Sequence, residues 1–182
     1  MKREDALAIV DELVQSPQMR GHCLTVEAFM RGLARHFGED EETWGIVGLL
    51  HDADYEATEK DLDRHTVLGC EKAAARGADD VILDGIRAHA ALVPLDTRLK
   101  QSIYACDNLA GLIVACALVH PERRIGALTP EFVHKRFKQK SFARTANREE
   151  ILTCEENLHI PLPEFIAIGI SSLAAVGPEV GL

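Results

Sequence analysis

Apolar residues recur every three to four positions along most of the chain, which is the spacing of amphipathic α-helices. Stretches in which apolar and polar residues alternate, as in a half-buried β-strand, are absent from the sequence. The pattern therefore predicts an all-α protein, a helical bundle of about eight or nine helices. The expected helices cover about residues 3–15, 21–37, 41–52, 64–76, 79–91 and 97–119, and three more begin near Pro130, Asn147 and Pro163.

Local signals mark several helix boundaries. Asp40 precedes an apolar segment and is positioned to cap its first turn. Thr129 followed by Pro130 combines a capping residue with a proline at the first helical position. Residues 53–63 are polar and acidic, and they are predicted to form a loop. Since neither a linker nor an internal repeat interrupts the pattern, residues 1–182 are predicted to form a single domain.

Composition and charge narrow the class of partner. The 182 residues are 47% hydrophobic and 27% charged, which is typical of one globular domain. Lys and Arg number 20 against 29 Asp and Glu, giving a formal net charge of -9. An acidic chain of this kind disfavours binding to nucleic acid and to anionic membrane surfaces, and we expect neither partner.

Signals for export and for membrane insertion are missing from the sequence. The N-terminal residues carry scattered charges and no apolar segment of the kind found in signal peptides. The longest apolar run, 105–119, is interrupted by Asp107 and Asn108 and is shorter than a membrane span. Five cysteines lie in apolar surroundings and form no CxxC pair, which predicts reduced, buried thiols. Together these features favour a cytoplasmic location.

A small set of polar side chains falls on helical faces that are otherwise apolar. A carboxylate on such a face costs several kcal/mol unless it has a partner. Individually, each histidine could be an ordinary core residue, the His-Asp pair a helix cap, and the aspartate part of a buried ion pair. A divalent metal ion would account for all of them at once, because imidazole nitrogen and carboxylate oxygen are its common ligands. The residues are His22, His51, Asp52, His89 and Asp107.

The order of these residues is similar to that of a known family. A histidine, then a His-Asp pair after an apolar helix, then an aspartate within an apolar helix resembles the HD-domain superfamily of metal-dependent phosphohydrolases. The similarity spans about residues 20–115, in the segments Gly21–Glu56, Arg64–Gly77, Ile86–Ala90 and Ile103–Ile113. The chain as a whole looks like a small bacterial branch of that superfamily, with a C-terminal helical extension over about residues 129–176.

The resemblance implies a metal site. One divalent ion (Mn, Fe, Zn, Co, Ni or Mg) is expected to be bound by His22, His51, Asp52 and Asp107. Some branches of the superfamily hold a second ion with two further histidines, and His65 and His89 occupy those places here, with Asp52 as the bridge. We rank one ion ahead of two.

Asp54 departs from the superfamily's commoner HDIG pattern. It is interpreted first as a solvated loop acid, and otherwise as a residue that orients a ligand histidine. Asp52 and Asp54 are also the two carboxylates that we expect as proton acceptors in catalysis.

The activity implied by the resemblance is hydrolysis of a small phosphorylated substrate by a metal-activated water. A nucleotide, a phosphomonoester and a cyclic phosphodiester remain open as substrates. The alternatives are an HD-fold di-iron oxygenase and a non-catalytic sensor that binds a metal or a nucleotide.

Two further segments have two interpretations each. The basic segment 135–148 either brings a cation over the site to bind a substrate phosphate or, as we favour, is a solvated helix face. The apolar helix 165–176 either joins the core or forms the surface of a homodimer.

Overall fold

The computed structural model describes residues 1–58, 61 and 64–182, and these residues form nine α-helices, two short 3-10 helices and no β-strand. The predicted all-α class is therefore confirmed. The 3-10 helices are η1 (Ile125–Ala127) and η2 (Gly177–Val180). The α-helices are α1 (Arg3–Leu13), α2 (Pro17–Phe37), α3 (Glu41–Leu50), α4 (Val67–Ala75), α5 (Asp80–Ala88), α6 (Arg98–Val119), α7 (Pro130–Phe137), α8 (Arg148–Asn157) and α9 (Leu162–Ala174).

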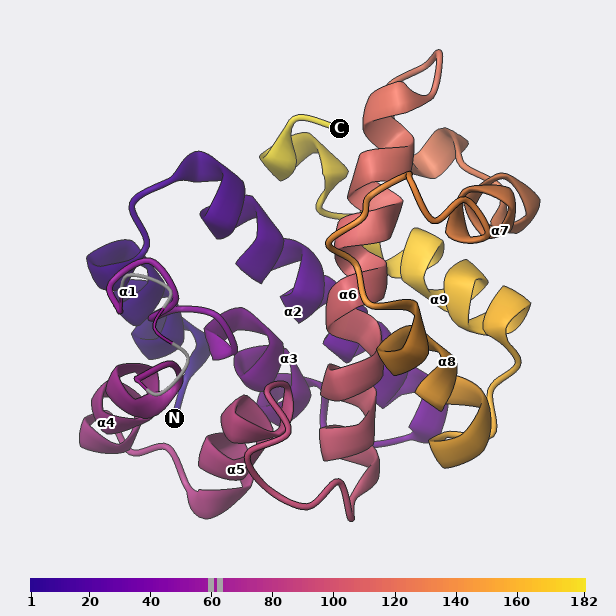
Figure 1. The fold of residues 1–182 in the computed structure, drawn as a ribbon. Coiled ribbons are helices and arrows are strands. Elements are labelled where there is room, and N and C mark those ends of the chain that lie inside the picture. The colour runs from indigo at the N-terminus through magenta and orange to yellow at the C-terminus, as the bar shows by residue number, and fades with distance from the viewer. Residues whose placement is uncertain (59–60, 62–63) are drawn as a thin grey trace.

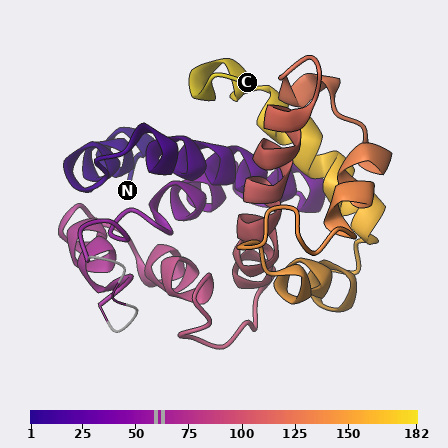
Figure 2. The same cartoon turned by 45° about the horizontal axis from the view of Figure 1, so that its top comes forward.

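Two long helices, α2 and α6, organise the bundle (Figure 1). Helix α2 contacts α3, α6 and α9, and α6 also contacts α5, α7 and α8. Helices α1, α3, α4 and α5 lie on one side of α6, and α7, α8 and α9 lie on the other. This division is visible again in the second view (Figure 2). Helix α6 therefore separates the part of the chain that resembles the HD superfamily from the C-terminal extension.

Capping chemistry explains where several helices begin. Asp40 accepts a hydrogen bond from the Thr43 amide, and Thr129 caps α7 ahead of Pro130, both as predicted. The start of α2 differs from the prediction, because this helix begins at Pro17 rather than near residue 21. The Ser16 side chain caps it, and a proline is compatible with the first turn, where its missing N–H has no helical partner.

The ends of the helices differ from the predicted ones by a few residues. Helix α1 ends at Leu13, and α4 is shorter than the predicted 64–76. Helix α3 ends at Leu50, so the chain has left regular helix when it reaches His51 and Asp52. Residues 59–60 and 62–63 of the predicted loop lie outside the described residues.

Helix α6 has the length and apolar composition of a membrane span, which the interrupted apolar run did not suggest. More than half of its most apolar stretch is buried inside the protein, however, and it packs against six other α-helices. It is therefore described as a core helix. Helix α9 is a core helix as well, because it buries Phe165, Ile166 and Leu173 and contacts α2 and α6. The five cysteines are free and buried, as predicted.

Candidate metal centre

Six side chains from separate parts of the chain converge between α2, α3, α5 and α6. His22 lies in the second turn of α2, and Asp107 lies in the middle of α6. The others follow the ends of α3 and α5 or precede α4; they are His51, Asp52, His65 and His89. Because His51 and Asp52 lie in the turn after α3, two consecutive side chains can face the same point.

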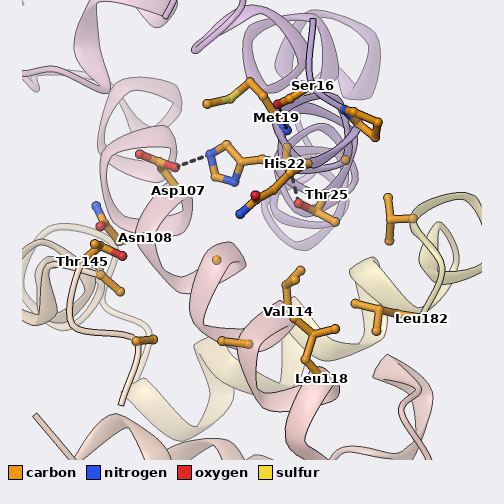
Figure 3. A pocket seen from close by; sticks show the side chains of 18 of the residues that line it. Ser16, Met19, His22, Thr25, Asp107, Asn108, Val114, Leu118, Thr145 and Leu182 are labelled. Atoms are coloured by element: carbon orange, nitrogen blue, oxygen red, sulfur yellow. Dashed lines mark hydrogen bonds and ion pairs between the residues drawn. The ribbon is translucent and has the colours of Figure 1, made fainter. Parts of the chain in front are cut away.

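The first group consists of His22, His51 and Asp107. The Nε2 atom of His22 lies 3.0 Å from the Asp107 carboxylate (Figure 3) and 3.1 Å from the Nε2 atom of His51. The His51 Nε2 atom is 3.4 Å from the same carboxylate oxygen. The sequence left an ion pair with a basic residue open for Asp107, and the structure gives it histidine partners instead.

The second group consists of Asp52, His65 and His89. The two histidines approach each other through their Nε2 atoms at 2.8 Å. One Asp52 oxygen lies 3.2 Å from the His65 Nε2 atom and 3.3 Å from that of His89. The donor atoms within each group lie within 4.8 Å of one another, so either group could hold a metal ion.

Asp52 connects the two groups. Its Oδ1 atom belongs to the second group, and its Oδ2 atom lies 3.7 Å from the Nε2 atoms of His22 and His51 in the first. A carboxylate with one oxygen toward each of two metal-binding groups is the arrangement of a bridging ligand. The donor set, imidazole nitrogens with carboxylate oxygens, suits first-row divalent metals.

Hydrogen bonds from the far side of each ring fix the orientation of three histidines. His51 donates through Nδ1 to the Gly48 carbonyl at 2.8 Å, and His89 donates to the Ile86 carbonyl at 2.5 Å. His65 donates through Nδ1 to Asp54 at 2.9 Å. Since Nδ1 donates in each case, Nε2 is the ring nitrogen that faces the group, and it can bind a metal once it has lost its own proton.

Asp54 is buried, with 1% of its surface exposed, so its interpretation as a solvated loop acid is wrong. Besides the His65 ring, its carboxylate accepts hydrogen bonds from the backbone amides of Thr66 and Gly69. The sequence could not show this, because these donors come from the turn before α4 and from its first residues. Asp54 therefore holds His65 in position beside Asp52 and His89.

The electrostatics of the centre favour bound positive charge. Burial alone would lower the pKa of His51, but Asp52 and Asp107 outweigh it and raise the pKa to about 9. Burial opposes protonation of His65 as well, and its hydrogen bonds to Asp52 and Asp54 raise the pKa to about 9. Burial tends to raise the pKa of Asp107, yet the neighbouring His22 and His51 hold it far below its usual range.

A cleft of about 860 Å³ leads to the first group, and His22 and Asp107 lie at one end of it (Figure 3). Other parts of its wall come from the start of α2, the turn after α3, the outer face of α6, residues 143–146 and the C-terminal residues. Asn108, Gly111 and Thr145 also line this cleft, and the sequence pattern does not mark them as functional residues. The only local signal was Asn108, a second polar residue in an apolar helix.

The basic segment 135–148 contributes no cation to the described lining of the cleft. Lys135, Lys138, Lys140 and Arg144 are exposed, in agreement with the favoured interpretation of a solvated surface. Arg148 instead has a structural role, because it donates to the backbone carbonyls of Phe137, Phe142, Ala143 and Ala146. These bonds hold the segment that forms one wall of the cleft.

Comparison with known proteins finds one family. A family model described as the HD domain matches residues 19–112, which include all six side chains of the two groups. Nothing matches among the curated proteins or the solved structures with which the chain was compared.

Proposed function

The chain belongs to the HD-domain family, and we therefore propose that it is a metal-dependent phosphohydrolase acting on a small phosphorylated substrate. The observation that carries the proposal is the convergence of four side chains. The Nε2 atoms of His22 and His51 lie 3.0–3.7 Å from carboxylate oxygens of Asp52 and Asp107. A divalent ion bound there would supply Lewis acidity and make water nucleophilic near neutral pH.

A second ion in the group of Asp52, His65 and His89 is part of the proposal. The sequence ranks a single ion ahead of two, with His65 and His89 in the places of a second pair of histidines. In the structure the contacts within the second group are as short as those within the first. This observation supports two ions, bridged by Asp52.

The two carboxylates expected to accept a proton have different surroundings. Both oxygens of Asp54 accept hydrogen bonds from the protein, so this residue positions His65 and has no oxygen directed at the substrate. Asp52 is the more accessible of the two carboxylates, with 16% of its side chain exposed against 1% for Asp54. We assign the proton from the attacking water to Asp52.

Substitution of Asp107 tests the activity. Asp107→Ala removes one ligand of the first group and should abolish phosphatase activity together with the metal bound in that group. Asp11→Ala is the matched control, because Asp11 is an exposed partner of Arg20 and is not one of the donors. Elemental analysis and a metal-by-substrate phosphatase screen measure the two properties. Full activity of Asp107→Ala would contradict the proposal.

One specific observation favours a second candidate function. Two histidine-containing groups joined by a carboxylate are also what a di-iron oxygenase of this fold requires. Protein purified without oxygen would then carry two irons and a visible absorption band. Colourless protein whose phosphatase activity depends on Mn, Zn or Mg would support the hydrolase.

A further inference from the structure

The cleft beside the first group runs along one face of α6. Asp107, Asn108, Gly111, Val114 and Leu118 all line it, at the spacing of a single helical face. At a rise of about 1.5 Å per residue, the distance along the helix from Asp107 to Leu118 is about 16 Å. The cleft is therefore long compared with a phosphate group.

The character of the wall changes along this length (Figure 3). Polar groups gather near the His22 and Asp107 end, where Asn108 and Thr145 lie together. Val114 and Leu118 follow farther along α6, and Leu182 faces them from the C-terminal segment. Leu118 is 49% exposed even though it is a large apolar residue, so an apolar ligand lying there would remove it from water.

Charge excludes some ligands from this space. None of the described residues that line the cleft is Lys or Arg, and Glu56 and Asp107 are acidic. A second or third phosphate of a nucleoside polyphosphate would lie beyond the metal groups without a cation to neutralise it. The cleft therefore fits one anionic group at the metal end and a neutral remainder.

We infer that the substrate is a phosphomonoester of an alcohol with an extended, largely apolar tail, which lies along α6 from Gly111 to Leu118. This inference rests on the proposed phosphohydrolase function for the phosphate end, whereas the tail end rests on the cleft alone. Hydrolysis cleaves the P–O bond, water supplies the hydroxyl of the released phosphate, and the tail leaves as the alcohol.

Gly111 offers a direct way to block the tail. A Cβ atom at this position would have no neighbour within 4 Å, so a larger side chain projects into open space. Gly111→Leu adds a good helix former in place of glycine and should leave the fold intact. Val119→Leu is the matched control, because Val119 is exposed on the same helix and does not line the cleft.

The experiment has two arms on the full chain loaded with Mn²⁺. In the first, hydrolysis of n-alkyl phosphates from ethyl to octyl is measured as kcat/KM. In the second, binding of the corresponding n-alkanols is measured by calorimetry, with no phosphate present. We expect kcat/KM and alkanol affinity to rise about two- to fourfold for each added methylene. Gly111→Leu should remove this dependence in both arms, and Val119→Leu should leave it unchanged.

The two arms distinguish failure of the tail site from failure of the proposed phosphohydrolase activity. In one outcome, alkanol binding depends on chain length and is abolished by Gly111→Leu, but no phosphate ester is hydrolysed. This result would support the tail site and contradict the proposed phosphohydrolase activity. In the other outcome, hydrolysis is independent of chain length or is fastest with nucleoside monophosphates. This result would contradict the apolar-tail substrate and still support the phosphohydrolase activity.

Discussion

Three of the four histidines of the candidate centre are oriented by hydrogen bonds from the side of the ring that faces away from it. His51 and His89 donate to backbone carbonyls in the preceding helical turn, which the geometry of α3 and α5 supplies without any special residue. His65 precedes α4, and its Nδ1 atom donates to the side chain of Asp54 where the other two donate to backbone carbonyls. Of the three histidines, His65 is therefore the one whose orientation a single substitution can most easily disturb.

We predict that Asp54→Asn weakens the second group specifically. The amide keeps the size of the side chain but cannot accept all three hydrogen bonds that the carboxylate accepts. We expect metal affinity at the second group to fall about 10- to 100-fold, which calorimetric metal titration measures. We also expect the free energy of unfolding to fall by about 1–3 kcal/mol.

The control for that substitution is Asp84→Asn. Asp84 is a surface carboxylate paired with Arg87 and Lys100, and its replacement should change stability by less than about 0.5 kcal/mol. Unchanged metal stoichiometry and affinity in Asp54→Asn would show that His65 holds its place without this carboxylate.

The raised pKa values of His51 and His65 predict how metal binding responds to pH. Both values are about 9, so near neutral pH these rings carry protons that an incoming metal ion must displace. Metal affinity should therefore keep rising from pH 7 to 9, by about tenfold per pH unit for each proton displaced. Histidines with the ordinary pKa of about 6.5 would give an affinity that is level in this range. Calorimetric titration with Mn²⁺ across these pH values distinguishes the two.

At the scale of elements, the contact of α3 with α2 sets the position of the His-Asp pair. Gly48 lies against α2 so closely that a Cβ atom would be 2.7 Å from the Val26 carbonyl oxygen and 2.9 Å from the Glu27 Cα atom. Backbone atoms on the opposing helix cannot move aside as a flexible side chain does. The last turn of α3 thus depends on glycine for its approach to α2.

We predict that Gly48→Ala displaces α3 and disturbs the first group. The free energy of unfolding should fall by about 1–3 kcal/mol, as is usual for overpacked cores, and metal content should fall with it. Gly111→Ala is the control, because its Cβ atom meets nothing within 4 Å and alanine favours the helix by up to about 1 kcal/mol. Thermal unfolding and elemental analysis of both variants make the comparison. A Gly48→Ala protein with native stability and metal content would contradict the argument.

The elements also show what the sequence could predict. Caps such as Asp40 and Thr129 act within one turn, so local chemistry identifies them, and the structure confirms both. From the sequence, Ser16 and Pro17 are interpreted only as the end of the first helix, although a capping residue followed by proline can also begin the next one. Here it begins α2.

For the molecule as a whole, the sequence does not predict contacts between segments that are far apart in the chain. His22 and Asp107 are marked by helical faces that are otherwise apolar, and this signal survives without a structure. His65 lies outside a helix and Asp54 outside the motif, so their contact with each other could not be inferred from spacing. The cleft escaped prediction for the same reason, because its walls come from segments far apart in the chain.

The whole fold should respond to the metal, because the donor groups tie α2, α3, α5 and α6 to one point. A ligand that binds only the folded state at 100 times its dissociation constant stabilises that state by about 2.7 kcal/mol. For a chain of this size, that gain corresponds to a rise in Tm of about 5–10 °C. We therefore expect Mn²⁺ to raise the Tm of the native protein by this amount and a chelator to reverse it.

Asp107→Ala provides the control, since it lacks a ligand of the first group. Mn²⁺ should raise the Tm of this variant less than that of the native protein, because only the second group can still bind the ion. A potassium salt at equal ionic strength should leave both proteins unchanged. An equal rise in the two proteins would mean that the stabilising ion binds away from the first group, and the link between that group and the helices would have to be abandoned.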